Sequence, residues 1–229
     1  MRTNYGEHRS QFFDTWEPET PHPVGTAVAI HGGWWRDRHD LHLMDRMCAH
    51  LTQDGWRVHN LEFRRTGRDG GRWPETLEDV LTALSLIGGE SPRPVLIGHS
   101  AGGHLALMAS RNQPSLPVVA LAPITDLVDS YYNVLGEGAT SLFVRPATAE
   151  SLREASPLYA PTTAPQFIVH GTADDRVPLE HSRTYIQRAC VGADDIELYE
   201  VADGDHFCLI DPHAAFWPVI EAWMRARSR

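Results

Sequence analysis

The feature that most restricts the fold of this chain is a regular alternation of short apolar strands with amphipathic helices. Two neighbouring strands that run in the same direction need a crossover connection between them, and a helix usually provides it. The alternation therefore predicts an α/β fold, in which a mostly parallel, doubly wound sheet carries helices on both faces. The expected strands cover residues 24–30, 56–63, 94–98, 117–122, 166–170 and 195–201, and the expected helices cover residues 40–55, 76–89, 101–110 and 179–190.

Capping residues predict where the first two of these helices begin and end. Asp40 is expected to cap the first helix, because a short polar side chain accepts hydrogen bonds from free backbone N–H groups. Gly55 is expected to end it, since glycine readily adopts the left-handed backbone found at helix ends. Thr76 is expected to open the second helix, with Asp79 three residues later in the position of a capping box.

A single domain is expected over residues 1–229, because one hydrophobic core commonly serves an α/β chain of this length. Residues 127–164 interrupt the alternation and form no clean strand–helix unit. A long segment of this kind inside a compact domain is more often functional than idle. We therefore expect residues 127–164 to form a minimal lid over a pocket.

Composition excludes several classes of function. All 20 basic residues are arginine, so the chain has no lysine amine for a Schiff base, for pyridoxal phosphate or for a phosphate-binding P-loop. A formal net charge of −10 argues against general nucleic-acid binding, which depends on basic residues. The apolar runs are too short to cross a bilayer, and no targeting segment is visible. We therefore expect a cytoplasmic protein with no nucleic-acid or membrane partner.

The pentapeptide Gly98-His99-Ser100-Ala101-Gly102 joins an expected strand to an expected helix. In that context a G-x-S-x-G sequence forms a sharp turn that exposes the serine hydroxyl, and the turn is too tight for side chains at the flanking glycines. The following helix also directs the positive end of its dipole toward the serine. Ser100 is therefore the candidate nucleophile.

A serine nucleophile needs a base that accepts its proton and an acid that orients the base. In this kind of fold the chain order is serine, acid, histidine. Asp174 follows the expected strand 166–170, and His206 follows the expected strand 195–201. Both lie at the carboxyl ends of strands, where open parallel sheets bind ligands. The sequence therefore predicts Asp174 as the acid and His206 as the base.

Two other aspartates compete for the role of the acid. Asp175 is the direct neighbour of Asp174, and Asp126 follows the expected strand 117–122, from which a carboxylate can also reach the histidine. The phrase G-x-x-D-x-x-V-P, which begins at Gly171, favours Asp174.

Backbone N–H groups are the expected donors to the oxyanion that forms during acyl transfer. The sequence HGGWW at residues 31–35 follows the first expected strand, and its glycines allow the backbone to approach a substrate closely. The N–H groups of Gly33 and Trp34, together with that of Ala101 after the nucleophile, are the predicted donors.

No metal and no other cofactor are expected. The chain has 13 histidines, but no phrase such as H-E-x-x-H accompanies them. His39 and His42 lack a third ligand nearby and are expected to lie at the solvated start of a helix.

Nearly the whole chain resembles an α/β-hydrolase of the esterase and kynurenine formamidase (arylformamidase) group. The segments that carry the resemblance are YGEHRSQFFDTWEP, HGGWW, RWPETLEDV, GHSAGGHLAL, ASPLYAP, HGTADDRVP and DHFCLIDP. The resemblance implies the α/β-hydrolase fold, with Ser100 as nucleophile, Asp174 as acid and His206 as base. It also implies that Gly33 and its neighbour donate to the oxyanion. The chain departs from the group at Trp34, a large ring beside the reacting centre, and in its apparent lack of a full cap domain.

The resemblance implies a serine hydrolase that cleaves a small aryl formamide, such as N-formylkynurenine in tryptophan catabolism, through a formyl-enzyme. The alternative is a carboxylesterase for acetyl, short-chain or aryl esters, because the same groups serve either reaction. A non-catalytic ligand receptor is a third hypothesis, although such receptors usually lack a member of the triad. The expected partner is a small-molecule amide or ester, and a homodimer is compatible with the sequence.

Aromatic side chains near the motifs are candidates for an apolar slot that holds an aryl ring. Each of them can equally belong to the hydrophobic core. These candidates are Trp34, Trp35, Tyr131, Tyr132, Phe143 and Phe207.

Overall fold

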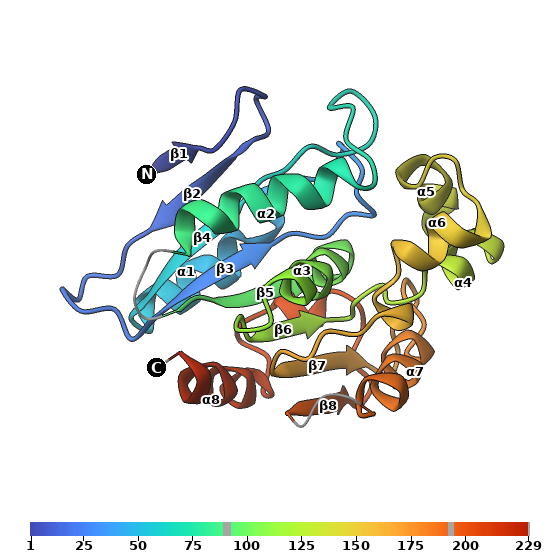
Figure 1. Cartoon of the computed structure of the whole chain (residues 1–229). Coiled ribbons are helices and arrows are strands. Elements are labelled where there is room, and N and C mark those ends of the chain that lie inside the picture. Colours follow the sequence, from blue (N-terminus) through green and yellow to red (C-terminus); the bar gives the residue numbers. More distant parts are fainter. Residues whose placement is uncertain (89–92, 192–194, 229) are drawn as a thin grey trace.

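A mostly parallel sheet of eight strands forms the centre of the protein in the computed structural model, which describes residues 1–88, 93–191 and 195–228 (Figure 1). The strands are β1 (Arg2–Asn4), β2 (Phe12–Trp16), β3 (Gly25–Ile30), β4 (Trp56–Leu61), β5 (Val95–His99), β6 (Val118–Leu121), β7 (Gln166–Gly171) and β8 (Ile196–Val201). Their order across the sheet is β1-β2-β4-β3-β5-β6-β7-β8. The strands from β4 to β8 in this order pair in parallel, whereas β1 and β2 form an antiparallel edge.

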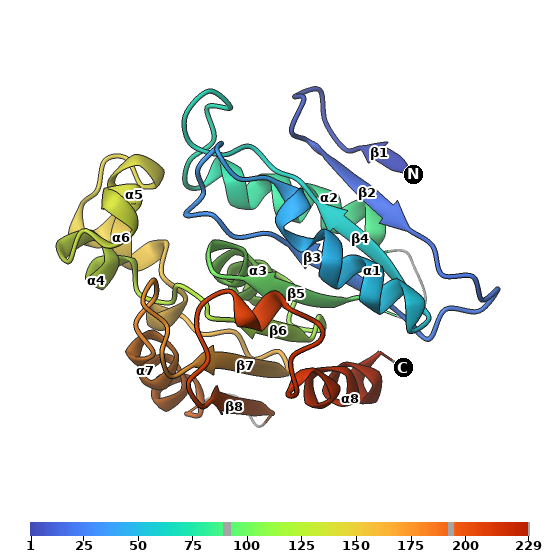
Figure 2. The ribbon, with the colours of Figure 1, turned by 180° about the vertical axis from the view of Figure 1, so that it is seen from behind.

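Helices cover both faces of the sheet, as the alternation predicts. The helices are α1 (Asp45–Gln53), α2 (Glu75–Ile87), α3 (Ala101–Asn112), α4 (Leu127–Tyr132), α5 (Leu135–Phe143), α6 (Ala149–Glu154), α7 (Glu180–Ala189) and α8 (Trp217–Arg227), with short 3-10 helices at Leu41–Met44, Pro157–Tyr159 and Cys208–Ile210. Two views from opposite sides show α2 and α3 on one face and α1 and α8 on the other (Figures 1 and 2). In the described part of the chain, no helix is long and apolar enough to cross a membrane.

The central strands are buried on both faces, because their side chains alternate between two hydrophobic clusters. In β3, Val28 and Ile30 join the cluster that contains residues of α2 and α3, whereas Ala27 and Ala29 join the cluster that contains residues of α1 and α8. All four side chains are fully buried. A strand that is covered on both sides appears in the sequence as a continuous apolar run, which is why these strands could be predicted.

The structure confirms the predicted start and end of the first helical segment. Asp40 caps it, because its side chain accepts a hydrogen bond from the N–H group of His42. Gly55 follows α1 with a left-handed φ of +90°, a conformation that glycine adopts without steric cost.

The predicted capping box of the second helix is wrong. Helix α2 begins at Glu75 and has no side-chain cap. Thr76 donates its hydroxyl to the carbonyl oxygen of Arg64 instead, and the buried carboxylate of Asp79 pairs with the Arg64 guanidinium at 2.7 Å. Both side chains therefore serve a tertiary contact that local sequence does not reveal. Gly89, the last residue of this predicted helix, lies outside the described residues.

Residues 127–164 contain α4, α5 and α6, and these three helices lie beyond the carboxyl ends of the central strands (Figure 1). Backbone hydrogen bonds hold the segment in place. The N–H group of Leu158 donates to the carbonyl oxygen of Thr125 at 3.0 Å, and that of Trp73 donates to Phe143 at 2.8 Å. The segment is therefore packed onto the rest of the chain at the edge of the sheet where the predicted site lies.

Candidate active site

Ser100 lies at the sharp turn between β5 and α3. Its backbone has φ of +57° and ψ of −118°, which is strained for a residue with a side chain. The turn is held by the N–H group of Ser100, which donates to the carbonyl oxygen of Leu121 on β6 at 2.8 Å. Ser100 therefore lies at the carboxyl end of β5, directly before the first turn of α3.

Two close backbone contacts explain the glycines on either side of Ser100. A Cβ atom at Gly98 would overlap the carbonyl oxygen of Gly102, and a Cβ atom at Gly102 would overlap the carbonyl oxygen of Ile30 on β3. Because backbone atoms occupy the space at both positions, neither can carry a side chain without displacement of the main chain. The sequence-based explanation of these two glycines is confirmed.

Asp174 and His206 meet in the structure although they are 32 residues apart in the sequence. Nδ1 of His206 lies 2.7 Å from Oδ2 of Asp174. A carboxylate can only accept a hydrogen bond, so Nδ1 carries the proton and Nε2 of the neutral ring is free to act as a base. This is the tautomer that a serine nucleophile requires.

The Asp174 carboxylate is fully buried and surrounded by donors. It accepts hydrogen bonds from the N–H groups of Arg176 and Val177 at 2.8 and 2.9 Å, and Nε2 of His170 lies 3.3 Å from its Oδ2. Burial alone would raise the pKa of this carboxyl, but the hydrogen bonds from His170 and His206 outweigh that effect and hold the pKa well below its usual range. Asp174 is therefore a carboxylate at neutral pH.

The loop that carries His206 is fastened next to Ser100. Nε2 of His99 lies 2.9 Å from the backbone carbonyl oxygen of His206, and the two rings have centroids 4.5 Å apart. Among the described residues, no hydrogen bond joins the Ser100 hydroxyl to His206. Such contacts are often loose in the absence of a substrate and tighten during the reaction.

The two competing aspartates lie in other environments. Asp175 points to solvent, with 78% of its side chain exposed, and pairs with Arg176 at 3.3 Å. Asp126 caps α4, because its Oδ1 accepts hydrogen bonds from the N–H groups of Val128 and Asp129. Of the three candidates, Asp174 is the one that contacts His206.

The HGGWW loop passes close to Ser100. A Cβ atom at Gly32 would lie 3.0 Å from the Cβ atom of Ser100, so the backbone of the loop lies against the candidate nucleophile. Gly33, Trp34 and Trp35 have φ values of +108°, +54° and +55°, an unusual run of left-handed residues. In the described part of the chain, the N–H groups of Gly33, Trp34 and Ala101 donate no hydrogen bond. They are thus available to an oxyanion, as the prediction requires.

The six candidate pocket aromatics do not form one surface. Trp35 and Phe143 stack on each other with centroids 4.3 Å apart and are buried in the core, which is the second of the two alternatives that the sequence left open for them. Tyr131 packs partly against the same core, whereas Tyr132 is 68% exposed. Phe207 is half exposed, and its ring lies 5.3 Å from that of His206.

The ring of Trp34 lies against residues 127–164. A Cβ atom at Gly136 would overlap this ring, so the turn around Gly136 rests directly on it. Arg36 fastens the turn: Nη2 donates to the carbonyl oxygens of Gly136 and Glu137 at 2.9 and 2.8 Å, and Nη1 binds the Glu137 carboxylate at 2.8 Å. The turn around Gly136 and the HGGWW loop are therefore packed against each other.

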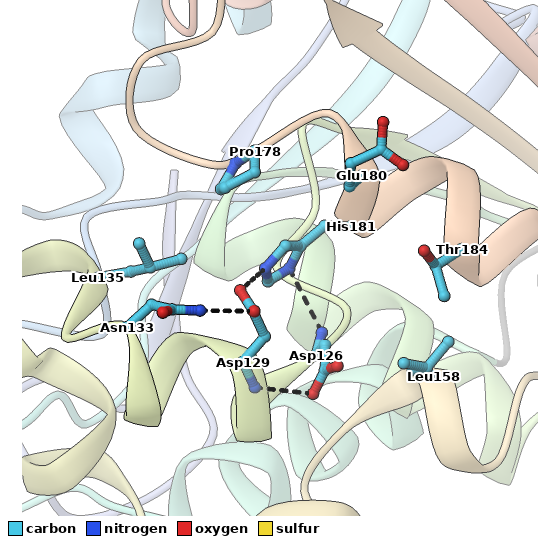
Figure 3. Close-up of a pocket in the computed structure, with 9 residues that line it drawn as sticks. All are labelled: Asp126, Asp129, Asn133, Leu135, Leu158, Pro178, Glu180, His181 and Thr184. Atoms are coloured by element: carbon cyan, nitrogen blue, oxygen red, sulfur yellow. Dashed lines mark hydrogen bonds and ion pairs between the residues drawn. The ribbon is translucent and has the colours of Figure 1, made fainter.

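A separate cavity of about 370 Å³ lies between α4 and α7 (Figure 3). It is lined by Asp126, Asp129, Asn133, Leu135, Leu158, Pro178, Glu180, His181 and Thr184. His181 is held from both sides, because its Nδ1 accepts from the N–H group of Thr125 at 3.2 Å and its Nε2 lies 3.1 Å from Asp129. Burial lowers the pKa of His181. Sequence reasoning missed this cavity, since its residues come from several elements that share no motif.

One group of metal-ligating side chains occurs among the described residues, and it lies outside this site. His50, Asp54 and Glu221 bring their ligand atoms within 4.8 Å of one another on α1, the turn after it and α8. His50 pairs with Glu221 at 2.6 Å, and Asp54 lies 3.8 Å from Arg225. His50 and Glu221 are therefore partners of each other, and Asp54 is a partner of Arg225, in contacts that join α1 and its following turn to α8.

Comparison with known proteins finds one matching family and several proteins of similar sequence or structure. A family model described as BD-FAE matches residues 14–188, a range that includes Ser100 and Asp174 but not His206. Two proteins of Mycobacterium tuberculosis are similar in sequence. The probable carboxylic ester hydrolase LipM is 26% identical over 218 residues, which cover 81% of this chain and 50% of LipM. Esterase LipC is 26% identical over an alignment of length 246, and the match covers 92% of this chain and 60% of LipC.

The chain therefore spans between half and three fifths of the length of these two relatives. Among solved structures, an acetyl ester-xyloside bifunctional hydrolase from Caldicellulosiruptor lactoaceticus is similar with a TM-score of 0.81 at 18% identity, over 94% of this chain and 87% of that chain. A likeness at this identity shows the fold alone, and it confirms the predicted α/β-hydrolase fold. Because the family match covers most of the chain, the protein belongs to the BD-FAE family of α/β-hydrolase esterases.

Proposed function

We propose that this protein is a serine esterase for esters of short-chain acids, with Ser100 as nucleophile, His206 as base and Asp174 as the acid that orients the base. The observation that supports the proposal most strongly is the 2.7 Å hydrogen bond between His206 and Asp174. His206 is at the same time bonded through its backbone to His99, the residue next to Ser100. The names of the two mycobacterial relatives favour an ester as the substrate.

In the proposed reaction, the Ser100 hydroxyl attacks the ester carbonyl carbon while Nε2 of His206 accepts its proton. The ionised Asp174 stabilises the imidazolium that forms. The negative oxygen of the tetrahedral intermediate is bound by the N–H groups of Gly33, Trp34 and Ala101. His206 then returns the proton to the leaving alcohol, and water hydrolyses the acyl-enzyme by the same steps.

The position of Trp34 supports a short acyl group. Its N–H group is one of the proposed oxyanion donors, so its side chain lies close to the reacting carbonyl. The ring is only 8% exposed and is covered by the turn around Gly136. A long acyl chain would have to displace this packed contact, whereas acetyl or formyl would not.

A formamide is the competing substrate, because the sequence resembles the kynurenine formamidase group as well as esterases. A small acyl site would accept a formyl group as readily as an acetyl group. The family match and the relatives favour the esterase, so we place the aryl formamide second.

Variant kinetics, covalent labelling and a comparison of substrates test the function. Ser100→Ala should reduce kcat for p-nitrophenyl acetate by roughly 10³-fold or more and abolish labelling by a fluorophosphonate, because the members of a triad act as a unit. Wild-type kcat/KM should fall from acetate to butyrate to hexanoate. Labelling at another serine would refute the nucleophile, and a higher kcat/KM for N-formylkynurenine than for aryl acetates would favour the formamidase.

A further inference from the structure

His99 is buried between the candidate nucleophile and the candidate base. It is the last residue of β5 and the direct neighbour of Ser100, and its side chain is 1% exposed. Its Nε2 lies 2.9 Å from the backbone carbonyl oxygen of His206. A residue of the strand that carries the nucleophile is thus bonded directly to the loop that carries the base.

The protonation of His99 follows from its partners. A carbonyl oxygen can only accept, so Nε2 must carry a proton. The other nitrogen, Nδ1, is buried without a hydrogen-bond partner. It faces Gly32 in the HGGWW loop, since a Cβ atom at that glycine would lie 3.0 Å from it. Among the described residues, the His99 side chain therefore donates one hydrogen bond, to the backbone of His206, and accepts none.

We propose that His99 is a positioning residue, which sets the distance between Ser100 and His206 through its hydrogen bond to the His206 backbone. This inference rests on the proposed function of Ser100, His206 and Asp174. The Asp174 carboxylate fixes the tautomer and orientation of the His206 ring, but it is attached to a different loop. The contact from His99 holds the backbone of His206 relative to the nucleophile itself.

The need for such a contact follows from the geometry of proton transfer. A general base must come within hydrogen-bond reach of the group it deprotonates, and a displacement of about 1 Å can cost about 100-fold in rate. His206 lies beyond the end of β8, the edge strand, and two strands, β6 and β7, lie between β8 and β5 in the sheet. The hydrogen bond from His99 bridges this separation directly.

The unpaired Nδ1 argues against a role for His99 as a space-filling residue. A buried nitrogen without a partner costs free energy, whereas an apolar side chain of similar size would fill the same space without that cost. Burial, followed by the proximity of His206, also lowers the pKa of His99 to about 3. The ring is therefore neutral at working pH and does not repel the imidazolium that forms on His206.

A matched pair of variants separates positioning from packing. In His99→Gln, the side-chain amide nitrogen lies the same number of bonds from Cβ as Nε2 of histidine, so the variant keeps an N–H donor. In His99→Met, the side chain has a similar size but no donor. We expect His99→Met to lower kcat for p-nitrophenyl acetate by about 10- to 100-fold with KM changed less than about twofold, and His99→Gln to stay within about threefold of wild type. Equal losses in both folded variants would show a packing role, and wild-type rates in both would remove the proposal.

A second measurement needs no variant and no activity. In protein labelled with 15N histidine, His99 should show the neutral tautomer protonated at Nε2 from pH 5 to pH 8, with slow exchange of that proton. A proton on Nδ1, or titration within this range, would overturn the inference. An active Ser100→Ala variant would instead refute the proposed function, whatever tautomer His99 adopts, so the two failures can be told apart.

Discussion

Asp174 and Asp175 are adjacent in the sequence but differ in burial and in partners. The Asp174 carboxylate is fully buried, accepts two backbone hydrogen bonds and contacts His206. The Asp175 carboxylate is largely exposed and pairs with Arg176. A buried, hydrogen-bonded carboxylate keeps one orientation, whereas an exposed ion pair is weak and mobile. The difference in environment gives a direct test of the proposed acid.

Asp174→Asn should lower kcat for p-nitrophenyl acetate by several orders of magnitude, because an amide in place of the carboxylate no longer fixes the tautomer of His206 or stabilises its charge. Asp175→Asn should change kcat by less than about threefold, since surface ion pairs contribute little. Steady-state kinetics of both purified variants check the prediction. The reverse order of the two effects would assign the acid to Asp175.

The sequence predicted Ser100, Asp174 and His206 together because each follows a recognisable strand within a short motif. The 2.7 Å contact between the last two agrees with that prediction. The contact from His99 to the His206 backbone was not predicted, since no sequence pattern specifies which way a buried imidazole points. The sequence left open whether Trp35 and Phe143 line a pocket or belong to the core, because proximity to a motif does not distinguish the two.

At the scale of elements, the turn that covers Trp34 has an unusual backbone. Val134, Gly136, Glu137 and Gly138 all have φ between +54° and +72°. Each residue with a side chain costs on the order of 1 kcal/mol in this conformation. The three hydrogen bonds from Arg36 are placed to offset that cost and to keep the turn on the Trp34 ring.

Arg36→Met should loosen this turn and widen the space beside Trp34. We expect the ratio of kcat/KM for acetate over hexanoate to fall by about threefold or more, because the larger acyl group gains room that the smaller one does not need. Arg38→Met is the matched control, since the one ion pair of Arg38 among the described residues is with the exposed Glu137 carboxylate, at 3.5 Å. Equal loss of kcat/KM for both esters in Arg36→Met would contradict a role of the turn in acyl selection.

The elements that sequence reasoning missed depend on tertiary contacts or on weak patterns. Strand β1 has three residues and is defined by its antiparallel pairing with β2, so no local periodicity reveals it. Helices α4 and α6 have six residues each, too few for a clear helical repeat. Helix α8 buries Trp217, Ile220, Trp223 and Met224 at helical spacing. That spacing is a helical repeat that the sequence itself carries.

At the scale of the whole molecule, buried neutral histidines connect stability to pH. Burial lowers the pKa of His104 to about 4, although its hydrogen bond to the Ala155 carbonyl oxygen opposes the shift, and the pKa of His99 is about 3. In the unfolded chain both side chains would have a pKa near the ordinary histidine value of 6.5. Below that pH the unfolded state binds more protons, so stability is fully present above pH 6.5 and falls as the pH falls toward 4.

The free energy of unfolding should therefore decrease between pH 6.5 and pH 4.5, with each such histidine contributing a slope on the order of 1 kcal/mol per pH unit. His104→Gln removes one of these groups and keeps a donor for the Ala155 carbonyl oxygen. Urea unfolding at several pH values should give this variant a shallower slope than wild type. An unchanged slope would show that His104 has no part in the acid sensitivity.

The close backbone contacts at Gly98 and Gly102 bear on how a protein of this kind can diverge. Any mutation at these two positions must move main-chain atoms of β3 or α3, so nearly all such mutants will be lost to misfolding before their chemistry can be selected. Residues 127–164 are held by a few backbone hydrogen bonds, but they also contact the core through side chains such as Phe143 and Leu152, which can be exchanged one at a time. New substrate preferences in descendants of this protein should therefore accumulate in residues 127–164 while the serine turn stays unchanged, and a randomised library would yield more folded, active members there.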